Sequence, residues 1–114
     1  MKEREKLMGK FLTVWTMNPN APWPTNPADA LKLNEAFWAA MDGLMKKGEI
    51  TDFGWFLDGR SGYAIGEGDS VTVFKNINMF SAYFNMTVEE IIPYEVGKQV
   101  NRAHYKALIA ATKQ

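Results

Sequence analysis

The sequence predicts a single α+β domain in which a four-stranded antiparallel sheet carries helices on one face, with a further helix at the C-terminus. Three observations lead to this prediction: runs of β-branched and aromatic residues, runs with apolar residues every three or four positions, and glycine- or proline-rich breaks between them. The runs follow the order β-α-β-β-α-β-α. The 114 residues are enough for one hydrophobic core and too few for two.

The composition is that of a neutral globular protein. Thirteen basic residues balance 13 acidic ones, so we expect neither nucleic acid nor an anionic membrane as a partner. The sequence contains no cysteine, which excludes disulfides, thiolate metal sites and a cysteine nucleophile. No apolar stretch approaches the roughly 20 residues that cross a bilayer. We expect a cytoplasmic protein, with residues 1–9 as a flexible extension and residues 10–114 as the domain.

The first predicted strand covers residues 11–17 and has two largely apolar faces, which favours a central position in the sheet. Phe11, Thr13, Trp15 and Met17 share one of these faces. The loop that follows, residues 18–25, contains three prolines and carries Trp23. Two interpretations of Trp23 stay open, the lip of a pocket and a plug at the end of the core.

A helix is predicted to begin at Asn26 and to end at Gly48. Asn26 would cap it, Pro27 fits the first turn, and Asp29 complements the positive end of the helix dipole. Its apolar stripe consists of Ala30, Leu33, Phe37, Met41 and Leu44.

The second half of the chain is predicted to contain two further strands, a helix, a fourth strand and the C-terminal helix. The strands cover residues 49–57, with Ile50 on the same face as Asp52, and residues 63–67. The helix runs over residues 70–83 after an Asp69 cap. Residues 86–96 form the fourth strand, where Pro93 indicates an edge or a bulge, and Gly97 ends it. Residues 98–113 form the last helix.

The order β-α-β-β-α-β is the ferredoxin-like pattern. Such a sheet has one face covered by helices and one face open. Here the open face would carry several large apolar residues, which predicts a partner. A twofold homodimer whose two sheets face each other is the simplest arrangement that covers both faces.

Residues 10–96 also resemble the dimeric α/β-barrel superfamily, in particular its muconolactone-isomerase-like and related small proteins. The resemblance rests on the strand Phe11–Met17, the Asn-Pro start of the helix, the stretch Gly62–Glu67 before Asp69-Ser70, and the ending Ile91–Val96. It implies a homodimeric barrel with a small-molecule pocket in each subunit between the sheet and the helices. The superfamily includes isomerases, cofactor-poor monooxygenases and haem-handling enzymes.

Two residues are candidates for moving protons. Glu67 lies among glycines that permit close approach of a ligand, and burial would raise its pKa. His104 is the only histidine, so it is the natural general base, and a multi-histidine metal site is excluded. Haem ligation through His104 is the one cofactor interpretation. Both residues also have simpler interpretations, as a turn carboxylate and as a helix-surface histidine.

Seven aromatic residues are candidates for lining the pocket, and Tyr63 or Tyr94 would orient the substrate. The seven are Trp15, Trp23, Trp38, Phe56, Tyr63, Tyr83 and Tyr94. Ordinary packing in the core and at the dimer interface is the alternative interpretation of each.

The sequence therefore predicts a homodimer that binds a small, partly apolar molecule, as an isomerase or a cofactor-poor oxygenase if it is an enzyme. A non-catalytic structural or interaction dimer is the alternative. The stretch Arg60–Ile65 also partly resembles the third-strand signature of the RNA-recognition motif. Ile65 and Glu67 stand where that signature has aromatic residues, which opposes RNA binding.

Overall fold

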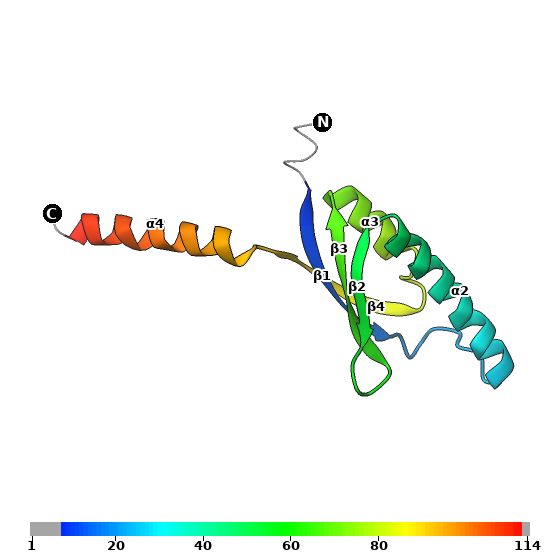
Figure 1. The fold of residues 1–114 in the computed structure, drawn as a ribbon. Helices are drawn as coiled ribbons and strands as arrows, with labels where there is room; N and C mark the ends of the chain where they lie inside the picture. The colour runs from blue at the N-terminus through cyan, green and yellow to red at the C-terminus, as the bar shows by residue number, and fades with distance from the viewer. Residues whose placement is uncertain (1–7, 113–114) are drawn as a thin grey trace.

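The computed structural model describes residues 8–112 and has an α+β fold (Figure 1). Four antiparallel strands form one sheet in the order β2-β3-β1-β4, which is compatible with a ferredoxin-like fold. The strands are β1 (Gly9–Met17), β2 (Ile50–Trp55), β3 (Ser61–Gly68) and β4 (Phe84–Ile91), and the helices are α2 (Pro27–Lys46), α3 (Ser70–Asn78) and α4 (Tyr94–Thr112). The predicted order of elements and the central position of β1 are confirmed. The predicted extension lies outside the described residues, apart from residues 8 and 9.

The pairing of β1 with β3 decides which residues face the helices. Trp15 pairs with Gly62, and Thr13 pairs with Ala64. Because side chains alternate along a strand, these residues share the helix-covered face. Gly62 has no side chain, and the indole of Trp15 occupies the space in front of it: an added Cβ would lie 2.5 Å from Cζ2 of Trp15.

Strand β2 contains an irregularity that the sequence did not predict. Ile50 pairs with Gly66, whereas Asp52 pairs with Ile65. Between these two pairs, β2 advances by two residues while β3 advances by only one, as in a β-bulge. The bulge moves Ile50 to the helix-covered face with Phe53, so the prediction that Ile50 shares a face with Asp52 is wrong.

The start of α2 is the predicted one. Oδ1 of Asn26 accepts a hydrogen bond of 2.9 Å from the backbone N–H of Asp29, and Pro27 is the first helical residue. Gly48, which follows the helix, has a φ of +78°, a conformation that glycine adopts without strain. The cap and the stop were both local signals, which is why the sequence was sufficient to place them.

Helix α3 also starts as predicted but is shorter. Oδ1 of Asp69 accepts a hydrogen bond of 2.8 Å from the N–H of Thr72. The helix ends at Asn78 rather than at residue 83. Phe84 already pairs with Met17 in the sheet, so the chain must reverse between these two points. Tertiary pairing outweighs the local helical periodicity here.

The end of the chain differs most from the prediction. Strand β4 ends at Ile91, and α4 begins at Tyr94, so residues 92–96 are not a strand and Gly97 lies inside the helix. The N–H of Gly97 donates a 2.9 Å hydrogen bond to the carbonyl of Pro93. Pro93 therefore opens a helix, a position that suits its fixed φ and its missing N–H.

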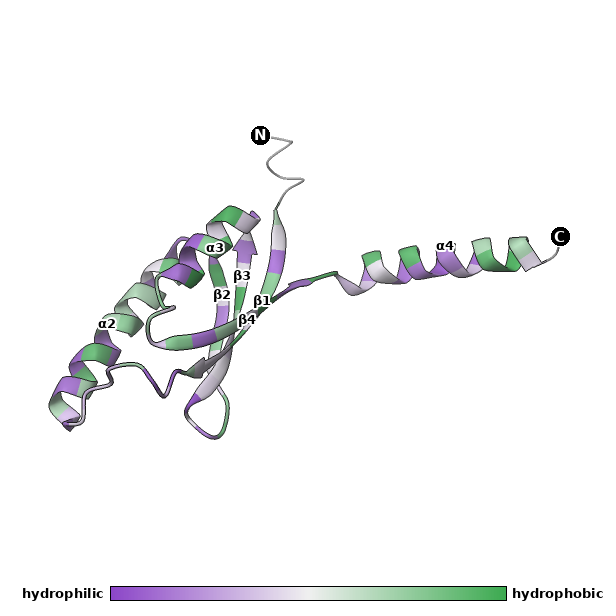
Figure 2. Cartoon of the chain, turned by 180° about the vertical axis from the view of Figure 1, so that it is seen from behind, coloured by the Kyte–Doolittle hydropathy of each residue, from purple (hydrophilic) through white to green (hydrophobic). Residues whose placement is uncertain are grey.

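The elements form two layers and an arm. Helices α2 and α3 cover one face of the sheet, while α4 extends away on the other side without touching the body (Figures 1 and 2). No residue of α4 is buried. The Cα radius of gyration is 19.2 Å, against about 13 Å for a compact domain of this length.

No described element covers the second face of the sheet. This open face carries Leu12 and Val14 of β1 and Tyr63 and Ile65 of β3, which the strand alternation places side by side. All four are half-buried because large side chains on a sheet cover one another. The open face therefore has an apolar centre, with polar residues such as Asp52 and Glu89 on its two edge strands. The helix α4 projects on the same side of the sheet.

Candidate ligand-binding cavity

A cavity of about 120 Å³ lies between the helix-covered face of the sheet and α2. Its lining is mostly apolar, and its aromatic residues include Trp15, Trp23, Phe37, Trp38, Phe53 and Trp55. Strand alternation supplies Trp15, Phe53 and Trp55, and the helical repeat supplies Phe37 and Trp38. The cavity follows from this arrangement, because bulky rings from two layers meet without filling the space between them.

Trp15 forms the floor of the cavity. Its indole is 7% exposed, stacks on Phe53 with ring centroids 5.6 Å apart, and meets Phe84 edge to face at 5.4 Å. Among the described residues, Nε1 of Trp15 is the one buried side-chain nitrogen or oxygen without a hydrogen-bond partner. Leaving such a donor unsatisfied costs about 1–3 kcal/mol.

The cavity opens to solvent between α2 and the edge strand β2. Trp38 of α2 is 42% exposed and Trp55 of β2 is 56% exposed, although both line the cavity. Two large apolar rings thus form its rim. An exposed apolar rim of this kind marks the entrance to a ligand-binding or interaction site.

Three polar side chains lie among the lining residues, namely Thr13, Asn34 and Asn76. The amide nitrogen of Asn34 donates to the carbonyl of Ala30, and that of Asn76 donates to Oε1 of Glu49, each at 2.9 Å. Within residues 8–112, the lining contains no carboxylate, imidazole or amine side chain. The cavity can therefore orient a ligand by hydrogen bonds but offers no titratable side chain for proton transfer.

Trp23 satisfies both interpretations that the sequence left open. Its Nε1 donates a 2.6 Å hydrogen bond to the carbonyl of Asn18, which fixes the loop on the body. Its ring packs against Tyr83 and Phe84 at 5.0 and 5.5 Å and also lines the cavity. The proline-rich loop is thus a packed wall of the cavity.

The structure separates the nine candidate residues into three places. Trp15, Trp23 and Trp38 meet at the cavity, and Tyr83 contacts Trp23 from behind. Phe56 and Tyr63 stack at 6.3 Å on the other side of the sheet, where the alternation of β3 also places Glu67. Tyr94 and His104 lie on α4 and are exposed.

Phe53 and Trp55 line the cavity but are not among the seven aromatic candidates chosen from the sequence. The signal was present, because strand alternation places both on one face of the predicted second strand. The sequence did not reveal the register between β2 and β3. In the structure Phe53 pairs with Ala64 and Trp55 pairs with Gly62, and this register places both rings on the same face as Trp15. Phe37 was predicted only as a core residue of the helix, and it contributes to both core and cavity.

On the open face, Tyr63 donates a 2.9 Å hydrogen bond from its hydroxyl to Oδ2 of Asp52. This bond, together with partial burial and the nearby charge, raises the pKa of Tyr63 above its usual value of 10.0. The bond holds the ring flat against its neighbours and orders this part of the face.

Replacing Asp52 by asparagine is expected to return the pKa of Tyr63 toward 10.0, because the asparagine carries no charge that opposes ionisation. A raised folded-state pKa adds stability that is present below the unfolded pKa and is lost as the pH rises through the folded pKa. The variant should therefore lose stability below pH 10 and show a weaker decline above it. Ultraviolet titration of tyrosine measures the shift, and an unchanged titration curve would contradict the contact.

Residues 8–112 contain no group of three or more His, Cys, Asp or Glu side chains placed to hold a metal ion. None of the described helices combines the length and hydropathy required to cross a membrane. Comparisons of the chain with protein-family models, with curated proteins and with solved structures found no match. The resemblance to the dimeric α/β-barrel superfamily therefore stays a prediction.

Proposed function

We propose that this protein binds a small, mostly apolar molecule with one hydrogen-bond acceptor in the cavity between the sheet and α2. The observation that carries the proposal is the cavity with its large aromatic residues, together with the buried and unpartnered Nε1 of Trp15, one of the lining residues. A protein interior is normally packed without such a space. A bound molecule would fill the space, and a small shift of the Trp15 ring would let an acceptor on that molecule satisfy the donor.

The volume limits the ligand to about one ring. An apolar cavity of about 150 Å³ stays dry and binds benzene, and the volume here is about 120 Å³. The open rim at Trp38 and Trp55 leaves room for a short substituent. Flat aromatic walls favour a flat ligand, because rings stack or meet edge to face at such distances.

The ligand should carry an acceptor and no charge. An indole N–H donates only, so it selects a carbonyl, ether or hydroxyl oxygen. A charged group in this apolar lining would be costly because no side chain of opposite charge lies in it. These two conditions describe small aromatic ketones, phenols and similar neutral molecules.

The lining supports binding more directly than catalysis. An isomerase or a cofactor-poor oxygenase that uses acid–base chemistry needs a group to move protons. Glu67 lies on the open face of the sheet and His104 lies on α4, so neither is among the lining residues of the chain's own cavity. A reaction here would take its acid or base from the substrate, from water or from a second subunit.

We further propose that the protein acts as a homodimer whose open sheet faces meet. The apolar patch of Leu12, Val14 and Ile65, with Tyr63 beside it, lacks a covering element among residues 8–112. A second copy offers the same patch, so a twofold contact is self-complementary. This is the arrangement that the sequence analysis predicted.

Titration calorimetry with acetophenone and ethylbenzene tests the binding proposal. The two molecules have nearly the same shape and differ in one carbonyl oxygen. We expect both to bind and acetophenone to bind about two- to twelvefold more tightly, since a net hydrogen bond contributes about 0.5–1.5 kcal/mol. A buried alkyl side chain in the cavity should abolish binding of both.

Ala64→Leu supplies that alkyl group, because Ala64 is buried and lines the cavity. The matched control is Ala39→Leu, which makes the same change at an exposed position of α2. Absence of binding in the unmodified protein, or equal binding by the Ala64→Leu variant, would reject the cavity as the site. A protein that is dimeric and binds neither probe would favour the interaction-dimer alternative.

A further inference from the structure

Helix α4 has an apolar stripe that packs on no other element of residues 8–112. Its members are Val96, Val100, Ala103, Ala107 and Ala111, spaced by three or four residues and so placed on one side of the helix. Val96 is 50% and Val100 62% exposed. Apolar residues recur on successive turns of α4 in Figure 2. Most of the stability of a helix in a protein comes from the packing of its apolar face, so this stripe favours a surface on which α4 packs.

The linker prevents α4 from folding back freely onto its own sheet. Only Ile92 and Pro93 separate β4 from α4, and the proline ring fixes its own φ and restricts the residue before it. The helix instead projects on the side of the open sheet face (Figure 1). A second subunit placed on that face would lie directly alongside α4.

A matching apolar stripe lies on the outer side of α2. Leu31, Trp38 and Met45 are seven residues apart, so they share one face of the helix, and their exposed fractions are 53%, 42% and 43%. Trp38 is also part of the cavity rim. Trp38 thus joins the stripe on α2 to the mouth of the cavity, and no element among residues 8–112 covers either.

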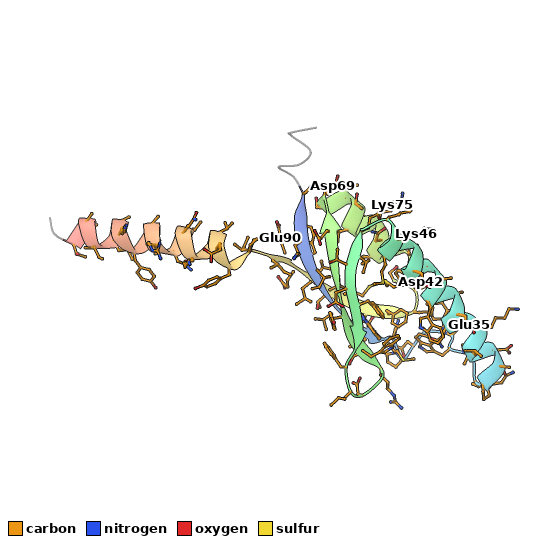
Figure 3. All side chains as sticks on the ribbon, viewed as in Figure 1. Glu35, Asp42, Lys46, Asp69, Lys75 and Glu90 are labelled. Carbon is orange, nitrogen blue, oxygen red and sulfur yellow. The ribbon has the colours of Figure 1, made fainter. Side chains whose placement is uncertain are left out.

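The charges beside the two stripes are complementary. Lys106 flanks the α4 stripe, and Arg102 lies one turn earlier and further round the helix. Neither has an ion-pair partner among residues 8–112, whereas Lys98 pairs with Glu95 of the same helix. Glu35 and Asp42 lie on α2 between successive stripe residues, and Figure 3 shows both side chains on this helix. Lys46, Lys47 and Lys75 lie near the C-terminal end of α2. Complementary charges of this kind favour one docking orientation over others.

Chain geometry indicates which part of a second copy α4 can reach. In a facing-sheet dimer with its twofold axis parallel to the strands, β4 of one sheet lies opposite β2 of the other. A rotation about such an axis does not exchange the two ends of the strands. The end of β4, where α4 starts, therefore lies beside the first residues of the partner's β2 and the C-terminal end of the partner's α2. Facing sheets are about 10 Å apart, and the 19 residues of α4 span about 28 Å, enough to pass the partner's sheet and reach its helix layer.

We propose that α4 of one subunit packs across the cavity mouth of a second copy of this chain, against the stripe of Leu31, Trp38 and Met45. The inference rests on the proposed dimer and deepens it. Each subunit thereby closes the ligand cavity of the other. The cavity is complete only in the dimer, and ligand entry requires the arm to move.

Paired cysteines test this contact, because the chain has no cysteine of its own. The full-length variant Met45→Cys/Ala103→Cys is treated with a short bismaleimide and run on a denaturing gel. We expect a dimer-mass product. Within one chain, residue 103 lies on an arm that does not contact the body, so the product must join two chains.

The matched control is Met45→Cys/Tyr105→Cys, which places the second thiol at nearly the same level on the opposite side of α4. It should yield about fivefold less product, because a short linker requires facing side chains. Equal yields from both pairs, or no dimer product from the first pair, would overturn the proposal. A product from Ala103→Cys alone would overturn it too, because it places α4 against α4.

The assay separates the arm from the ligand. The cross-linking assay contains no probe molecule. A cross-link in a protein that fails to bind acetophenone would therefore support the α4 contact and reject the binding proposal. A protein that binds acetophenone without the cross-link supports the binding proposal and rejects the arm. A single-chain mass in solution together with no cross-link rejects both the dimer and the arm.

Discussion

Replacing Gly62 by alanine is expected to destabilise the fold more than any other methyl-sized change in the sheet. An added Cβ would overlap the carbonyl oxygen of Gly54 on the neighbouring strand and would lie 2.5 Å from Cζ2 of Trp15. The backbone oxygen cannot move without breaking the β2–β3 ladder, and Trp15 is held by Phe53 and Phe84. Overpacking of this severity costs about 3 kcal/mol or more.

Thermal unfolding measures the effect. A loss of about 3 kcal/mol lowers the melting temperature of a domain of this size by roughly 12–24 °C. Gly43→Ala is the matched control, because no atom lies within 4 Å of the added methyl group and alanine in an exposed helix is favoured by about 1 kcal/mol. A Gly62→Ala protein with the same melting temperature as the unmodified protein would show that Trp15 does not lie over Gly62.

The second large effect is expected at the open sheet face. Val14→Lys places an ammonium group in the centre of the proposed interface, between Leu12 and Tyr63 on the same face. A buried charge without a partner costs about 3 kcal/mol or more, which raises the dissociation constant about 100-fold or more. The chain alone should still fold, because a lysine stem can lie along the apolar neighbours with its charge in water.

Light scattering after size exclusion measures the outcome, with a subunit mass of 12.9 kDa as the reference. The unmodified protein should have twice this mass and the variant the subunit mass. Ala36→Lys adds the same charge at an exposed position of α2 and should stay dimeric. An unmodified protein with the subunit mass at high concentration would contradict the facing-sheet arrangement.

Local signals predicted much of the fold. The cap at Asn26, the proline at the first helical position and the cap at Asp69 each depend on residues three positions apart, so no tertiary information was needed. The face shared by Thr13 and Trp15 followed from strand alternation. Trp15 of β1 and Trp38 of α2 could therefore be named from the sequence as candidate lining residues.

The remainder depended on contacts that a sequence pattern does not contain. Pro93 is compatible with an edge strand and with a helix start, and only the pairing of β4 with β1, which ends at Ile91, decides between them. The bulge after Ile50 reverses which residues face the helices. The cavity itself results from the register of β2 with β3 and from the position of α2 above them, neither of which follows from local periodicity.

The indole N–H resonance of Trp15 reports directly on whether a ligand occupies the cavity and bonds to its floor. The protein has four tryptophans, so a nitrogen–proton correlation spectrum contains four indole signals, which single tryptophan-to-phenylalanine variants assign. We predict that acetophenone moves the Trp15 signal downfield as a hydrogen bond forms, while ethylbenzene leaves it nearly in place and shifts Trp38 and Trp55. A Trp15 signal that stays unchanged at saturating acetophenone would contradict the proposed binding site.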